Sequence, residues 1–150
     1  MTFSRRHTLF RAIVSLATLP LLAACENSVT SMIVDNKDHA LVLVREQHYF
    51  WSDKIEQYIV VSRLPDCQHR IKIHPDRTTM TPVAVYEAGD LLWALKQGGR
   101  WYLASTEKCQ LQDWGNPGNQ PPGQAVGNFW QRNGKPVFTS TAGQSPSAGS

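Results

Sequence analysis

The chain has 150 residues and a formal net charge of +3, from 15 Lys and Arg against 12 Asp and Glu. Arg5, Arg6 and Arg11 account for the whole excess, and every acid lies after them. The rest of the chain is therefore electrically neutral and gives no reason to expect a nucleic-acid partner. Its length suits one domain with a modest core.

The first 25 residues have the organisation of an export signal. The basic stretch that ends at Arg11 contains no acid, and the apolar run 12–22 is broken only by Ser15, Thr18 and Pro20. This run is too short to cross about 30 Å of hydrocarbon, so it predicts a secretory signal rather than a stable transmembrane helix. It leads into Leu22-Ala23-Ala24-Cys25, which resembles the lipobox of bacterial lipoproteins.

The resemblance implies that residues 1–24 are a signal peptide and that Cys25 becomes the first mature residue, with acyl groups such as palmitate on its sulfur and amine. Two or three such chains hold a protein stably on a membrane, whereas one holds it weakly. Because Glu26 rather than Asp follows Cys25, the resemblance favours the outer membrane over the inner one, with the protein facing the periplasm. An ordinary secretory signal with a chance Cys is the alternative.

The export route stays open at this point. Ser4-Arg5-Arg6 followed by Leu9 also resembles a twin-arginine signal, although Thr8 departs from the usual Phe. Paired arginines are common in ordinary signals as well, so the sequence is compatible with either the Sec or the twin-arginine route.

Two further cysteines, Cys67 and Cys109, form an even pair in a chain predicted to be exported. The oxidising periplasm favours a disulfide between them. Such a bond would close a loop of about 43 residues and stabilise the fold by roughly 4 kcal/mol. A free catalytic thiol is the alternative.

Residues 25–31 are predicted to be the lipidated Cys and a polar tether. After them, short apolar or alternating runs bounded by Gly, Pro, Asn and Asp are typical of an antiparallel all-β fold. The segments 35–38 and 98–99 are predicted to be hairpin turns. The seven predicted strands are 32–34, 40–45, 58–63, 69–74, 83–86, 91–95 and 101–104.

Two segments are ambiguous. His48-Tyr49-Phe50-Trp51 and the residues after it fit either a strand with a turn or a short helical turn that starts at Ser52. The second ambiguous segment begins at Gly115. These last 36 residues hold seven of the ten Gly, five of the nine Pro and no acid. The small apolar surface of this segment cannot offset the conformational entropy that the chain would lose on folding. Residues 115–150 are therefore predicted to be a flexible tail.

The apolar side chains of this tail leave two alternatives. Phe129-Trp130 and Pro136-Val137-Phe138 could form final strands that dock on the domain, with Asn133-Gly134 as the turn between them. They could equally be a linear motif that binds a partner. The predicted architecture is a single all-β domain over residues 32–114, an antiparallel sandwich or small barrel, with a disordered Gly/Pro-rich C-terminal tail.

Catalytic and metal-binding patterns are missing from the sequence. No nucleophile elbow, Gly-rich phosphate loop or His with paired acids occurs at a recognisable spacing, so an enzyme is not expected. His69 and His74 are five residues apart, which places them on opposite faces of a strand, and His39 and His48 lie near turns. We expect no metal site and no cofactor.

The pattern from Arg63-Leu64-Pro65-Asp66-Cys67 through Trp101-Tyr102 to Cys109 resembles small, uncharacterised periplasmic lipoproteins of proteobacteria. The sequence therefore predicts a membrane-anchored accessory or interaction module of the cell envelope, whose partners are the membrane and an envelope protein. The candidate partner contacts are Tyr49, Phe50, Trp51, Phe129 and Trp130. A β-barrel that binds a sugar or lipid is the alternative, as is an inhibitor of an envelope hydrolase, because small lipoprotein inhibitors of lysozyme share this plan.

Overall fold

The computed structural model describes residues 27–141. The expected signal peptide and Cys25, the expected lipidation site, lie outside this range, as does the end of the expected tail. The described part has ten strands and no α-helix. The strands are β1 (Asn27–Ile33), β2 (His39–Glu46), β3 (Lys54–Arg63), β4 (Cys67–Arg77), β5 (Val83–Gly89), β6 (Leu92–Gln97), β7 (Arg100–Ser105), β8 (Gln110–Trp114), β9 (Ala125–Arg132) and β10 (Lys135–Ser140).

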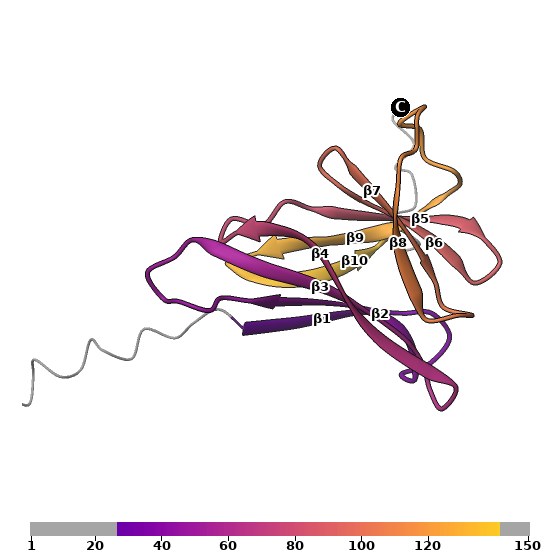
Figure 1. Cartoon of the computed structure of the whole chain (residues 1–150), viewed down its shortest axis with the longest axis horizontal. Coiled ribbons are helices and arrows are strands. Elements are labelled where there is room, and N and C mark those ends of the chain that lie inside the picture. The colour runs from indigo at the N-terminus through magenta and orange to yellow at the C-terminus, as the bar shows by residue number, and fades with distance from the viewer. Residues whose placement is uncertain (1–26, 142–150) are drawn as a thin grey trace, which may run out of the picture.

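The strands form two antiparallel sheets. Sheet A has the order β1-β2-β3-β4, and sheet B has the order β10-β9-β5-β6-β7-β8 (Figure 1). Each of the seven strands predicted between residues 32 and 105 overlaps one of β1 to β7, and both predicted turns join the expected strands. The all-β, sandwich-like prediction is confirmed.

The core lies between the inner faces of the two sheets. In sheet A, Leu41 and Leu43 of β2 lie opposite Val61 and Ile59 of β3, and all four are at most 1% exposed. This is the period-two alternation expected of strands with one buried face. Sheet B contributes buried side chains from four of its strands, among them Val83, Val85, Leu95, Tyr102, Ala104 and Phe129.

The two sheets also meet along both of their edges. The edge strands β1 and β10 run side by side (Figure 1), and the Thr30 hydroxyl donates a hydrogen bond of 3.2 Å to the Pro136 carbonyl. At the other edge a disulfide joins Cys67, the first residue of β4, to Cys109, which directly precedes β8. The predicted disulfide is thus confirmed, and it links the two sheets.

The tether prediction is wrong for residues 27–31, which belong to β1. This strand pairs with β2 from Asn27↔Glu46 to Ile33↔Ala40. Its side chains are mostly polar, but an edge strand gains its hydrogen bonds from the backbone and buries only part of one face. Polar composition was therefore a poor guide to order here.

The flexible-tail prediction is wrong for residues 115–141, and the alternative of docked strands is correct. Asn133-Gly134 is the turn between β9 and β10, with φ of 51° and 75°, as a two-residue hairpin turn of the I′ type requires. β9 pairs with β5, and Phe129 opposite Val83 is fully buried. The loop before β9 is also engaged, since Asn119 Oδ1 accepts a 2.8 Å hydrogen bond from the Trp101 indole.

The average composition of the last 36 residues is misleading because the apolar side chains are not spread evenly along them. The few apolar side chains of this segment are concentrated in one hairpin, whose strand β9 pairs with β5 at four positions, from Val83↔Phe129 to Tyr86↔Ala125. Local burial of Phe129 then outweighs the low average hydrophobicity.

Candidate functional site

The predicted site residues separate into three places. Cys67 and Cys109 are joined in the disulfide, so neither supplies a free catalytic thiol. Tyr49, Phe50 and Trp51 lie together on the loop between β2 and β3. Phe129 and Trp130 are neighbours on β9 but face opposite sides of sheet B.

The three loop residues, which we call the aromatic tip, are the largest exposed apolar side chains in the described chain. Their exposed fractions are 58% for Tyr49, 57% for Phe50 and 71% for Trp51. The rings pack on one another, with Trp51 stacked on Tyr49 at 5.1 Å between centroids and edge-on to Phe50 at 4.8 Å. Exposed apolar clusters of this kind mark surfaces that meet a protein or a membrane.

The loop that carries the tip is closed by its own hydrogen bonds. The Ser52 amide donates to the Tyr49 carbonyl at 3.0 Å, and Gln47 Nε2 donates to the Ser52 carbonyl at 2.5 Å. The segment is thus a tight turn, neither the strand nor the helical turn that the sequence left open. It holds the three rings in a defined arrangement.

Phe129 and Trp130 have different roles. Phe129 is fully buried and packs on Phe138 at 4.8 Å between ring centroids, so its predicted role as a partner contact is wrong. Trp130 is half-buried on the outer face of the same strand. Alternation along β9 therefore assigns one aromatic side chain to the core and its neighbour to the surface.

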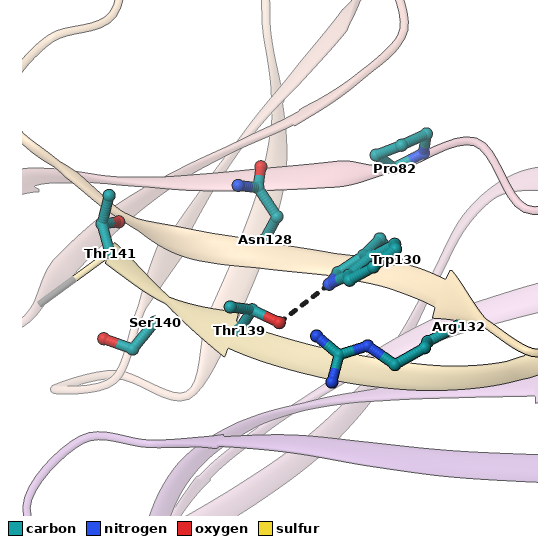
Figure 2. Close-up of a pocket in the computed structure, with 7 residues that line it drawn as sticks. All are labelled: Pro82, Asn128, Trp130, Arg132, Thr139, Ser140 and Thr141. Atoms are coloured by element: carbon teal, nitrogen blue, oxygen red, sulfur yellow. Dashed lines mark hydrogen bonds between the residues drawn. The ribbon is translucent and has the colours of Figure 1, made fainter. Parts of the chain in front are cut away.

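Trp130 lies in an open groove of about 450 Å³ on the outer face of β9 and β10. Figure 2 shows the seven lining residues: Pro82, Asn128, Trp130, Arg132, Thr139, Ser140 and Thr141. The Trp130 indole donates a 2.8 Å hydrogen bond to Thr139 Oγ1, and the Arg132 guanidinium lies 5.0 Å from the centre of the Trp130 ring. The hydrogen bond ties Trp130 on β9 to Thr139 on β10. We call this feature the Trp130 groove.

The chemistry of the Trp130 groove is that of a binding surface. Its size falls within the range of ligand-binding clefts. An aromatic ring supplies apolar contact, while the amide of Asn128 and the guanidinium of Arg132 supply hydrogen-bond donors at the two sides of that ring. Trp and Arg are also the side chains that most often dominate binding energy at protein interfaces.

Sequence reasoning had identified Trp130 but missed Asn128, Arg132 and Thr139. The signal was present in the alternation of Asn128, Trp130 and Arg132, which share the outer face of one strand. It was overlooked because the segment was assigned to a flexible tail.

A larger hollow of about 660 Å³ lies where the β2–β3 loop, the end of β4 and the β6–β7 turn meet. It is polar, and three of its charged side chains are already engaged: Arg77 pairs with Asp53 at 3.7 Å, and Asp76 accepts hydrogen bonds from the amide and hydroxyl of Thr81. Its inner wall includes Gln97, which donates a 2.7 Å hydrogen bond to the buried Gln57. Polar side chains therefore line this hollow at one end of the sandwich.

The outer face of sheet A carries a cluster of charges. Glu56 forms ion pairs with Lys54 at 2.7 Å and with Lys72 at 2.5 Å. Hydrogen bonds from these two ammonium groups lower the pKa of Glu56 to about 2. The hydrogen bond between Lys72 and Glu56 in turn raises the pKa of Lys72. A carboxyl group with so low a pKa stays ionised at neutral pH, which suits an ion pair rather than proton transfer.

Two further properties of residues 27–141 bear on the site. Within this range no three side chains of His, Cys, Asp or Glu come together in a group that could hold a metal ion. A helix with the length and apolar character needed to cross a bilayer is also missing from the same range.

No protein-family model matches the chain, and comparison with characterised proteins and with solved structures finds no significant match.

Proposed function

We propose that this protein is a lipid-anchored accessory module of the bacterial cell envelope, which binds an envelope partner through the Trp130 groove and does not act as an enzyme. The observation that carries the proposal is the groove itself, in which a half-buried Trp lies between Asn128 and Arg132 on the outer face of β9. The lipobox-like Leu22-Ala23-Ala24-Cys25 supports the anchor. The disulfide agrees with an oxidising compartment.

The anchor is tested with Cys25→Ala. Acyl chains on Cys25 would hold the protein on a membrane, and Glu26 after it favours the outer membrane. We expect the wild-type protein in the membrane fraction of the cell and the variant largely outside it, measured by fractionation and immunoblotting. Equal membrane association of the two proteins would contradict lipidation at Cys25.

The groove is tested by photo-crosslinking in cells from a photoreactive residue at position 141, on the rim of the groove. We expect it to capture one envelope protein, and we expect Trp130→Ala to abolish that capture. The control position is Glu107, exposed in the turn at the opposite edge of sheet B. Equal capture from position 107, or capture that survives Trp130→Ala, would contradict the groove as the contact.

A carbohydrate ligand is the second candidate, and a specific observation favours it. An aromatic ring flanked by an amide, a guanidinium and hydroxyl groups can stack on the apolar face of a sugar and bond its hydroxyls. Titration with neutral and N-acetylated oligosaccharides, followed by tryptophan fluorescence, tests this candidate. Saturable binding that disappears in Trp130→Ala would favour the sugar over a protein partner.

A further inference from the structure

The aromatic tip lies at the same end of sheet A as the start of the described chain. Asn27, the first residue of β1, is paired with Glu46, the last residue of β2, and Tyr49 follows Glu46 by three residues. Figure 1 shows the loop between β2 and β3 beside the beginning of β1, at the left of the view. The tip and the point where the chain enters the fold therefore share one end of the molecule.

Chain length ties the proposed anchor to this end. Cys25 precedes Asn27 by two residues, and two residues span at most about 7 Å. Neighbouring strands of a sheet are only about 4.8 Å apart. An acyl chain attached to Cys25 would thus enter the bilayer close to the base of the loop that carries the tip.

The side chains of the tip suit the region where lipid headgroups meet hydrocarbon. Trp and Tyr are enriched there because each ring has an apolar body and one polar group. Residues 48–52, His48-Tyr49-Phe50-Trp51-Ser52, contain no acid and no Lys or Arg. No carboxylate would have to be desolvated if the tip entered this region.

We propose that the aromatic tip inserts into the headgroup region of the membrane leaflet that holds the acyl anchor. This inference rests on the proposed lipidation of Cys25 and names the membrane as the partner of Tyr49, Phe50 and Trp51. Anchor and tip together make two attachments at one end of the sandwich, which restricts how far the domain can tilt. The Trp130 groove, on the outer face of sheet B, is then held in a constant orientation toward its partner.

The test uses the full, processed protein purified from membranes and reconstituted into vesicles of phosphatidylethanolamine and phosphatidylglycerol. The vesicles contain a phospholipid with a photoreactive diazirine near the glycerol end of its acyl chain. After irradiation, mass spectrometry locates the labelled residues and also reports whether Cys25 is acylated. We expect labelling within residues 49–51.

Ile33 is the matched internal control. It is 57% exposed, like Phe50, but it lies at the other end of β1, about 20 Å along the strand from Asn27. We expect no labelling of Ile33 above background. The variant Tyr49→Ser/Phe50→Ser/Trp51→Ser should lose the label in the loop while keeping its acyl groups, and circular dichroism should show that its fold is intact.

The outcomes separate the two proposals. An acylated protein without label in residues 49–51, or with equal label at Ile33, overturns the membrane contact and leaves the proposed function standing. A Cys25 without acyl groups overturns the lipid-anchor part of the proposed function and the membrane contact with it. A photoreactive residue at position 50 that captures an envelope protein in cells, in place of lipid, also overturns the membrane contact.

Discussion

Glu56 shows how a single residue couples the fold to pH. Lys54 and Lys72 hold its pKa at about 2, below its ordinary value of 4.5. Because the folded-state pKa is lowered, the carboxylate contributes stability that is complete above about pH 4.5 and is lost as the pH falls toward 2. We expect the free energy of unfolding of the wild-type protein to fall through this window, measured by urea unfolding at a series of pH values.

The variant Glu56→Gln should remove this contribution. Its stability deficit relative to the wild type should be largest at neutral pH and should shrink as the pH approaches 2, where the wild-type carboxyl also becomes neutral. The control Glu107→Gln, in an exposed turn, should show no such dependence. A deficit for Glu56→Gln that stays constant between pH 7 and pH 2 would mean that the ion pairs do not stabilise the fold.

At the scale of elements, the two faces of β9 differ in role. Phe129 on the inner face packs in the core, and Trp130 on the outer face lies in the proposed binding groove. Phe129→Ala would leave a cavity in the core and should lower the free energy of unfolding by about 3–5 kcal/mol. Trp130→Ala changes a half-buried surface position and should lower it by only about 1 kcal/mol. Urea unfolding of both variants measures the difference. Similar losses for the two would contradict the burial of Phe129, and with it the integration of β9 into sheet B.

For the whole molecule, the disulfide holds the two sheets together at one edge. Cys67 and Cys109 are 42 residues apart, so the bond restricts a large loop of the unfolded chain. The double variant Cys67→Ser/Cys109→Ser should lose roughly 4 kcal/mol of stability. Chemical denaturation measures the loss, and reduction of the wild-type protein should reproduce it. A loss below about 1 kcal/mol would show that the contact between β1 and β10 and the shared core suffice to join the sheets.

Much of the fold could be predicted because its signals are local. Alternation predicted the strand over residues 69–74, which lies within β4, and Gly98-Gly99 and Asn133-Gly134 supplied turn chemistry. The pairing of Cys67 with Cys109 followed from having two cysteines left to pair. The candidate site was predicted less well, since Trp130 and the aromatic tip were identified but Phe129 was assigned to a surface that it does not reach.

The remaining properties depend on contacts between distant segments. The residues around Asn27 in the sequence do not indicate that it pairs with Glu46. Likewise, the residues around Phe129 do not indicate that its strand pairs with β5. The sequence by itself determined seven of the strands, the turns between them and the cysteine pair, because each rests on period, backbone preference or counting within a short stretch. Only the tertiary structure decided that residues 27–31, 110–114, 125–132 and 135–140 are strands, that Trp130 lies in a groove, and that the aromatic tip shares an end with β1. Each of these depends on which strands lie next to one another, and strand order is set by the packing of the whole core.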